Sequence, residues 1–180
     1  MLSKSGKPRT GNPEVSELDL AWLAGIIDGE GSICVYWDVR SQRRIPRIKI
    51  SVANTDWLMI KRVRELFHAL TGRHYKACEK FQEGATHRQW QIFLNRRASV
   101  IQILAAIFPY MVARRRQAWA AIEMSRLTWR RNGILPQGLF AHAEFIKNCN
   151  RTPTQPDDKF QFETVETGRQ QIERLPCYSV

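Results

Sequence analysis

A helix that is apolar on almost every side and ends in two acidic residues is the feature that most constrains the fold of this sequence. Four residues follow the i, i+3, i+4, i+7 spacing of one helical face: Leu20, Leu23, Ala24 and Ile27. Trp22 and Ile26 cover much of the remaining surface. Because such a helix is normally buried on all sides, we expect the segment 17–27 to lie at the centre of the domain. Ser16 and Asp19 should form a capping box at its start.

Two departures from the usual rules of helix composition accompany this segment. Gly25 lies in mid-helix, where glycine costs about 1 kcal/mol relative to alanine, and together with Ala21 it would let a second helix approach closely. Asp28 and Glu30 follow at the C-terminal end, where the macrodipole is negative and backbone carbonyls lack partners. Carboxylate and carbonyl oxygens are the ligands that Mg²⁺ and Ca²⁺ prefer. The residues alone leave two interpretations open, a metal site or a glycine-rich helix end with two solvated acids.

The segment from Leu23 to Gly31 resembles the LAGLIDADG motif of homing endonucleases. Six of its nine residues are identical to that motif: Leu23, Ala24, Gly25, Ile27, Asp28 and Gly31. Ile26, Gly29 and Glu30 are substitutions that the family tolerates. The resemblance extends over roughly residues 18–148. It implies an α+β fold with the order αββαββα, in which an antiparallel sheet forms a DNA-binding saddle and the helices cover its other face.

The spacing of apolar residues predicts the same order of elements. Alternation predicts a strand pair over 33–40 and 47–53, apolar on one side and basic on the other. A helix should follow from Asn54-Thr55-Asp56 to about residue 70, then a second strand pair over 73–80 and 88–94. Asn95 should cap a helix that Pro109 breaks, and helices over 110–132 and 139–148 should complete the domain. Residues 1–15 are expected to form a basic N-terminal arm, 16–149 the domain, and 150–180 a polar tail.

Charge and cysteine spacing narrow the class of partner. The formal net charge of +11 and the pI of about 10.0 favour a polyanion, with nucleic acid first. No apolar run is long enough to span a bilayer, no secretory signal precedes the domain, and we expect no membrane partner. The four cysteines form no CxxC pair, which argues against a zinc site and for a reducing intracellular compartment. An organelle matrix and a bacterial or phage cytoplasm both fit.

One face of the predicted sheet carries basic and amide side chains that suit DNA. Arg and Lys pair with guanine edges or phosphates, and Gln pairs with adenine edges. Any antiparallel sheet has a polar solvent face, but the near absence of acids here, Asp38 excepted, favours a nucleic-acid surface. The residues expected to contact double-stranded DNA are Arg40, Arg43, Arg44, Arg47, Lys49, Ser51, His74, Lys76, Lys80, Arg88, Gln89, Gln91 and Arg116.

The resemblance also assigns the reacting groups. Glu30 and the carbonyl of Gly29 match the family's metal site, so Mg²⁺ is the expected cofactor, with Ca²⁺ or Mn²⁺ as substitutes. Asn54 matches a position that orients solvent near the metal, although a helix-capping role is equally open. Arg114 stands where relatives often have a lysine near the scissile phosphate. Because Arg keeps its proton, it could stabilise charge there but not act as a general base. We expect Arg115 on a solvated helix face.

A single copy of the motif predicts a homodimer, because cutting two DNA strands requires two acidic centres. The residues expected at the twofold interface are Ala21, Ala24, Gly25 and Asp28, although Asp28 could also cap or pack the helix end or serve as a metal ligand. A twofold protein predicts a pseudo-palindromic target. The expected function is therefore a site-specific homing endonuclease that hydrolyses phosphodiester bonds in double-stranded DNA. The alternative is a catalytically inert relative that serves as an RNA maturase for its intron or as a DNA-binding regulator.

Overall fold

Five helices and a four-stranded sheet make up the described part of the chain. The computed structural model describes residues 15–38, 45–80, 88–127 and 138–149. The elements in order are α1 (Glu17–Gly29), β1 (Gly31–Asp38), β2 (Ile45–Asn54), α2 (Trp57–Thr71), β3 (Ala77–Lys80), β4 (Gln89–Leu94), α3 (Arg97–Ile107), the 3₁₀ helix η1 (Phe108–Tyr110), α4 (Arg115–Arg126) and α5 (Leu139–Cys149). This order confirms the predicted α+β class and the αββαββα arrangement, with further helices after it.

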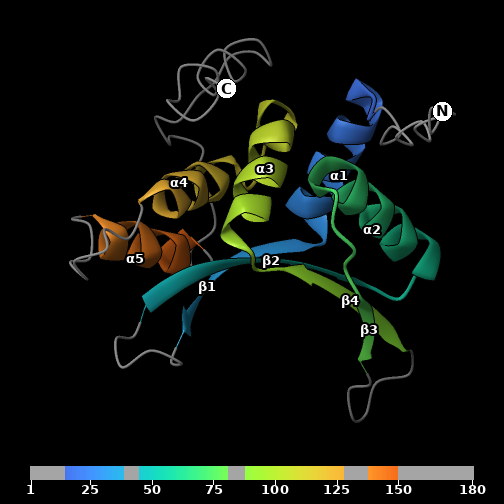
Figure 1. Ribbon diagram of the computed structural model, residues 1–180, viewed down its shortest axis with the longest axis horizontal. Helices are drawn as coiled ribbons and strands as arrows, with labels where there is room; N and C mark the ends of the chain where they lie inside the picture. Colours follow the sequence, from blue (N-terminus) through green and yellow to red (C-terminus); the bar gives the residue numbers. More distant parts are fainter. Residues whose placement is uncertain (1–14, 39–44, 81–87, 128–137, 150–180) are drawn as a thin grey trace, which may run out of the picture.

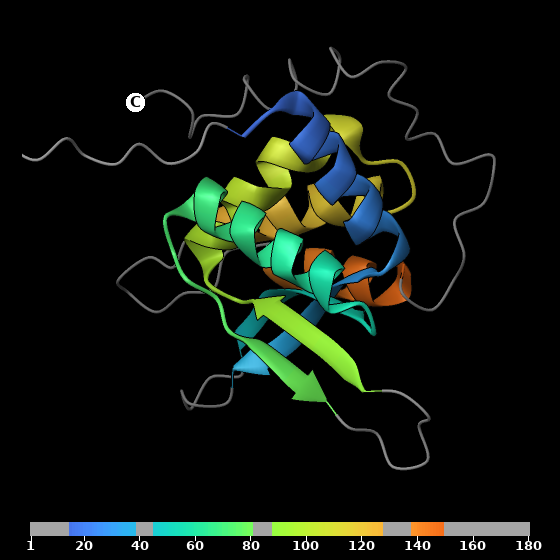
Figure 2. The same ribbon diagram turned by 90° about the vertical axis from the view of Figure 1, so that its right-hand side faces the viewer.

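The sheet is antiparallel throughout and has the strand order β1-β2-β4-β3. In Figure 1 it forms an arch, and all five helices lie on its convex side. Figure 2, turned by 90°, shows α2 next to α1 and above β4 and β3, running roughly along the direction of β4. None of the described helices lies on the concave side. We call it the free face, and by strand pairing it carries Ser32, Cys34, Tyr36, Arg47, Lys49, Ser51, Cys78, Lys80, Gln89, Gln91 and Phe93.

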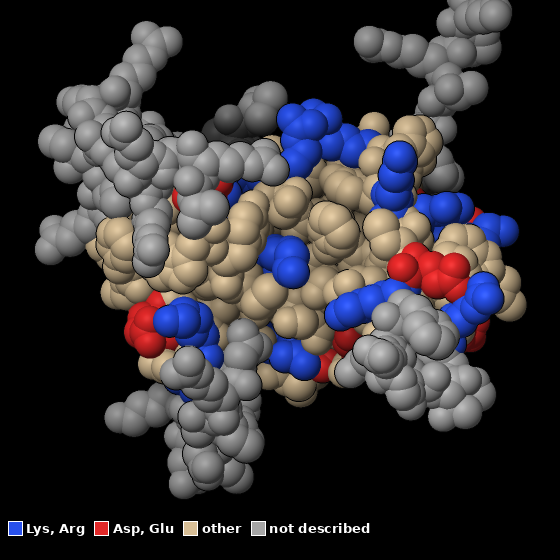
Figure 3. All heavy atoms as spheres, turned by 90° about the horizontal axis from the view of Figure 1, so that it is seen from below, with Lys and Arg blue, Asp and Glu red and all other residues tan. Residues whose placement is uncertain are grey.

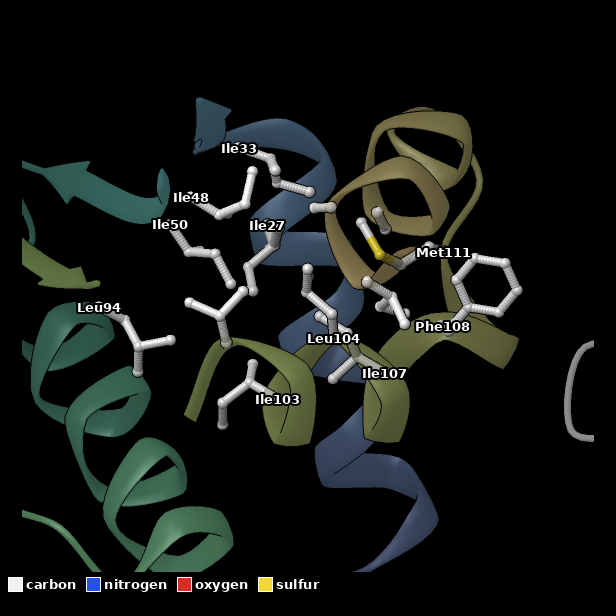
Figure 4. Packing of buried hydrophobic residues seen from close by; sticks show 14 of the residues in the cluster. Ile27, Ile33, Ile48, Ile50, Leu94, Ile103, Leu104, Ile107, Phe108 and Met111 are labelled. Atoms are coloured by element: carbon white, nitrogen blue, oxygen red, sulfur yellow. The ribbon is translucent and has the colours of Figure 1, made fainter. Parts of the chain in front are cut away.

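The core lies between the sheet and the helices. Ile33, Ile50 and Leu94 point up from the strands and are fully buried, as the alternation predicted. Figure 4 shows them packed against Ile27 of α1 and against the apolar side of α3. Burying side chains of this size contributes about 1.5–3 kcal/mol each. The expectation that α1 is buried on all sides was wrong, because only the side that carries Leu23, Ala24 and Ile27 packs into the core.

Local chemistry sets both ends of α1. At the start, the Ser16 hydroxyl accepts from the Asp19 backbone N–H at 3.2 Å and the Asp19 carboxylate accepts from the Ser16 N–H at 3.2 Å, which confirms the capping box. At the end, Gly31 starts β1 directly against the last turn. A Cβ atom on Gly31 would lie 2.5 Å from the carbonyl oxygen of Ile27, so only glycine fits. The chain thus enters the sheet with no connecting loop.

Several predicted boundaries were wrong. The helix predicted over 110–132 starts only at Arg115, because η1 and a turn over 111–114 come first. Asn95 caps nothing: the N-cap of α3 is Arg96, which makes no side-chain cap bond. The strand predicted from residue 73 begins at Ala77, where pairing with β4 begins. Within the described ranges, no helix is long and apolar enough to cross a membrane.

Candidate active site and nucleic-acid interface

The C-terminal end of α1 presents an exposed carboxylate beside exposed backbone. Glu30 is the C-cap residue, and its backbone N–H donates to the Ile26 carbonyl at 2.8 Å. Its carboxylate has no hydrogen-bond or ion-pair partner among the residues that the structure describes. Gly29 is exposed as well, and the last carbonyls of a helix lack intrahelical partners. An acid at the negative end of a helix is unfavourable without a cation, so this end is suited to binding one.

The donor set fits part of the coordination sphere of Mg²⁺. The Glu30 carboxylate and the Gly29 carbonyl are both hard oxygen ligands of the kind that ion takes. In the described ranges no cluster of three or more His, Cys, Asp or Glu side chains could hold a metal. A magnesium ion often keeps several waters and uses only one or two carboxylates together with substrate phosphates. One chain therefore offers an open site of the type found where the substrate completes the ligand set.

Asp28 is tied to a turn far along the chain. Its carboxylate accepts from the backbone N–H groups of Val112 at 2.6 Å, Ala113 at 3.1 Å and Arg114 at 2.9 Å. Its backbone carbonyl accepts from the Arg114 Nε at 3.2 Å. Asp28 had been placed on a twofold interface, but its oxygens are instead occupied within the chain. It does pack the end of α1, by joining it to the start of α4.

The three consecutive arginines at the start of α4 lie in different surroundings. Arg114 is half-buried beside the end of α1, so the structure brings it near the backbone of the acidic segment. Arg115 lies over the Phe108 ring at 5.1 Å, and burial lowers the pKa of its guanidinium while the nearby Asp28 charge raises it. Arg116 lies over the Phe145 ring of α5 at 5.4 Å. The predicted solvated face at Arg115 was wrong, and Arg116 is packed against α5, not extended from the surface.

Asn54 is the last residue of β2 and lies at the same end of the β1–β2 pair as Glu30. Gly31, which follows Glu30, pairs with Val52, so Asn54 lies only two residues beyond that pair. Its side-chain oxygen accepts from the Asp56 N–H at 2.8 Å. The helix cap itself is Asp56, whose carboxylate accepts from Leu58 N–H at 2.7 Å. Capping of α2 thus falls to Asp56, and Asn54 supports the turn before it.

One side of α1 faces outward and has small residues at its centre. Ala21, Gly25 and Gly29 are exposed there, beside Leu18 at 83% and Trp22 at 37% exposure. A Cβ atom on Gly25 or Gly29 would meet no described atom within 4 Å, so packing within the described ranges does not require glycine at either position. Ala24 had been predicted on the twofold interface, but it is fully buried in the core of its own chain.

Solved structures with a similar fold include homing endonucleases in complex with DNA. The homing endonuclease I-CvuI in complex with DNA superposes with a TM-score of 0.54 and 17% identity, over 89% of this chain and 96% of that one. The archaeal intron-encoded homing endonuclease I-Vdi141I, complexed with DNA, gives 0.56 and 11% identity, over 87% of this chain and 96% of that one. This chain has the LAGLIDADG homing-endonuclease fold. No family model and no curated protein matches the sequence, so the similarity rests on the structure alone.

In the LAGLIDADG fold of this chain the free face holds several of the residues predicted to contact DNA. Lys49 of β2, Lys80 of β3, and Gln89 and Gln91 of β4 lie there. Figure 3 looks onto this side and shows Lys and Arg side chains among mostly uncharged residues, with acidic side chains toward the margins. Arg47 shares this face but pairs with Asp38 at 2.8 Å. The surface is therefore basic and amide-rich, with one arginine held by an acid.

Other predicted contacts lie elsewhere or are less accessible. Ser51 is only 8% exposed, because the pairing places Ser32 and Phe93 on either side of it in the central strand. His74 stacks on the His68 ring of α2 with centroids 4.0 Å apart, so it contacts the helix layer. Arg88 pairs with Glu79 at 3.0 Å, and Lys76 is exposed just before β3. Arg40, Arg43 and Arg44 lie outside the described residues.

Two features of this fold were not predicted from the sequence. Phe93 is 42% exposed on the free face, and the alternation that buries Ile92 and Leu94 could have placed it there. The link from Asp28 to Val112–Arg114 has no local signal, because the partners are 84 to 86 residues apart. Only the folded chain brings them together.

Proposed function

We propose that this chain is a metal-dependent endonuclease that cleaves both strands of a specific DNA duplex as a homodimer. The observation that carries the proposal is the exposed, unpartnered Glu30 carboxylate at the end of α1, within the described residues. The LAGLIDADG fold adds a free face on the sheet that suits a duplex. A helix end that is unfavourable for an acid by itself is explained if a cation and a phosphate join it.

Chemistry at the site follows from the residues gathered there. The Glu30 carboxylate and the Gly29 carbonyl would hold Mg²⁺, with Ca²⁺ or Mn²⁺ as substitutes, and a bound ion would lower the pKa of a water and polarise the phosphate. Arg114 keeps its charge and would stabilise the developing charge on the phosphate oxygens. Asn54 would orient the attacking water through its amide group. Because Arg114 cannot accept a proton, it would not serve as the general base that activates the water.

The outward side of α1 would form the twofold contact. Gly25 costs helix stability, and no described residue occupies the space beside it. A second copy of α1 packed against Ala21 and Gly25 would recover that cost through close backbone contact, and it would bury Leu18 and Trp22. The two Glu30 residues would then lie close to the axis, each facing one strand of the duplex. A pseudo-palindromic target follows from this symmetry.

The free face would supply recognition. Lys49, Gln89 and Gln91 can reach base edges in the major groove, which admits a β-ribbon. Phosphate contacts by the basic side chains would make binding fall steeply as salt rises. The same surface would also serve an inert relative, either a DNA-binding regulator or a protein that binds its intron RNA. The Glu30 carboxylate favours cleavage over those two functions.

The direct test is a cleavage selection from a randomised duplex library, with and without Mg²⁺. We expect a single enriched, pseudo-palindromic site whose cut ends appear only with the metal. Enrichment of bound but uncut duplexes under both conditions would instead support the DNA-binding regulator. Retention of structured RNA and not of duplex would support the maturase.

A further inference from the structure

The carboxylate of Asp28 lies between the ends of two helices with opposite polarity. It belongs to the last turn of α1, where the macrodipole disfavours an anion. It accepts the three N–H groups of Val112, Ala113 and Arg114 that lead into α4, where the macrodipole favours one. The N-cap of α4 is Arg114, which makes no side-chain cap bond of its own. Asp28 therefore holds, from another helix, the turn before α4 and satisfies the backbone N–H of its N-cap residue.

The same residue fixes the Arg114 side chain as well as its backbone. The Asp28 carbonyl accepts from Arg114 Nε at 3.2 Å, and the Gln117 Oε1 accepts from Arg114 Nη1 at 3.4 Å. The remaining guanidinium N–H groups have no partner among the described residues, so they are available to an anion. Charge supports the geometry, because Asp28 also faces the half-buried Arg115. Asp28 thus contacts Arg114 through hydrogen bonds and Arg115 through its charge.

We infer that Asp28 is a positioning residue that holds the Arg114 guanidinium beside Glu30, through the 112–114 turn and its own carbonyl. This inference rests on the proposed function, because it assigns Arg114 to the phosphate. Only Gly29 separates Asp28 from Glu30, so any shift of the turn changes where Arg114 points relative to the proposed metal site. Asp28 would act through Arg114 and not directly on the metal or DNA, since its carboxylate oxygens already accept from three backbone N–H groups.

Asp19 is a matched control on the same helix. It is also an aspartate of α1, accepts a backbone N–H at 3.2 Å from Ser16, and pairs with an arginine, Arg62. Its partners lie at the opposite end of α1. Asp19→Asn should therefore reproduce a loss of helix-end stability without moving Arg114, whereas Asp28→Asn should do both.

The test is a double-mutant cycle in single-turnover cleavage at the selected site, with the variants Asp28→Asn, Arg114→Ala and the pair. We expect Asp28→Asn to lower the cleavage rate about 10- to 100-fold, the range for groups that orient reacting side chains. The pair should be no slower than Arg114→Ala alone, because Asp28 acts through Arg114. DNA affinity should stay within about twofold, and Asp19→Asn should cleave at the wild-type rate. Losses that multiply, or an unchanged rate in Asp28→Asn, would overturn the inference.

A second readout separates this inference from the proposed function. If wild-type protein cuts no site, the proposed function fails, and the nuclear magnetic resonance signal of Arg114 Nε–H still reports the position of the side chain. That signal should shift and exchange faster in Asp28→Asn but not in Asp19→Asn. An unmoved signal in Asp28→Asn would refute the positioning role whatever the activity. Should Asp28→Asn fail to fold, Asp28→Glu keeps the charge, displaces the oxygens by one methylene and enters the same measurements.

Discussion

The two ends of α1 carry acidic residues in opposite settings. At the N-terminal end, Glu17 and Asp19 lie where the macrodipole favours anions, and Asp19 is satisfied by Ser16 and Arg62. At the C-terminal end, Asp28 and Glu30 lie where it disfavours them. Asp28 is satisfied by a distant turn, but Glu30 is exposed and has no partner among the described residues.

This difference separates what folds the chain from what it does. The first end obeys every local rule for a helix start, so changes there should alter stability alone. The second end breaks a rule at Glu30 without any compensation inside the described chain, which is typical of a functional site. Substitutions at the two ends and on the outward side of α1 should therefore affect stability, assembly and cleavage differently.

Substitution of the unpartnered acid should have the largest effect. Glu30→Gln keeps the size of the side chain but removes the charge that a divalent ion needs. A ligand that stabilises the transition state by several kcal/mol is worth about a thousandfold in rate, so cleavage should fall at least that far. Binding to the selected duplex, measured by gel retardation in Ca²⁺, should remain within a few fold.

The matched variant at the other end is Glu17→Gln. It removes one carboxylate from the first turn and should leave the cleavage rate unchanged. Equal losses in the two variants would mean that the ends do not differ in function, and normal cleavage by Glu30→Gln would remove the metal role.

The junction between α1 and β1 should respond next. Gly31→Ala places a Cβ atom 2.5 Å from the Ile27 carbonyl oxygen. Neither atom can rotate away, because the carbonyl belongs to the backbone and the backbone fixes the position of the Cβ atom. We expect the free energy of unfolding to fall by about 1–3 kcal/mol, the usual cost of overpacking. Urea denaturation measures it. Gly29→Ala is the control, because a Cβ there meets nothing within 4 Å, and an equal loss would contradict the steric argument.

The outward side of α1 allows assembly to be separated from folding. Gly25→Leu adds a large side chain where the single chain has open space, so the chain should fold with equal or higher helix stability. A close twofold contact cannot hold that side chain, and sedimentation should therefore report monomers. An active, monodisperse dimer of Gly25→Leu would show that the two copies meet elsewhere.

Local patterns were sufficient to predict α1 and the sheet faces. The Ser16–Asp19 box, the apolar stripe through Ile27 and the alternation through Ile50 all depend on neighbours in the sequence. The order of elements followed from the same patterns. These features are predictable because each residue's environment is determined within a few positions of itself.

Contacts across the chain were not predictable in this way. The three consecutive arginines 114–116 cannot be told apart from their neighbours in the sequence. In the structure they contact Asp28, Phe108 and Phe145, respectively. His74 alternates correctly for a strand but stacks on His68, because pairing with β4 begins only at Ala77. The start of α4 was wrong for a similar reason, since an acid from α1 holds the preceding turn. Such outcomes depend on which distant groups the fold brings together.

The cap at the start of α1 should contribute a smaller amount. Ser16→Ala removes the hydroxyl that accepts the Asp19 N–H, and losses of this kind cost about 1 kcal/mol. Thermal unfolding of Ser16→Ala against wild type measures the change. The cleavage rate at saturating metal and DNA should not move, and Ser16→Thr should restore most of the stability.

The smallest effect should appear in the free energy of unfolding at acidic pH. The pKa of Asp19 lies below its usual value of 3.8 because the Ser16 hydroxyl donates to it, and the Arg62 guanidinium adds a further bond. A carboxyl group whose pKa is lower in the folded than in the unfolded protein stabilises the folded state at pH values above its unfolded pKa. This contribution is lost as the pH falls through the pKa of the folded protein. Asp19 should therefore titrate at a lower pH in the folded protein than in a peptide, as its carboxyl resonance will report. Ser16→Ala should raise that pKa more than Arg62→Gln does, since the hydroxyl makes the larger contribution. The reverse order would mean that the ion pair, and not the capping box, sets the chemistry of this end of α1.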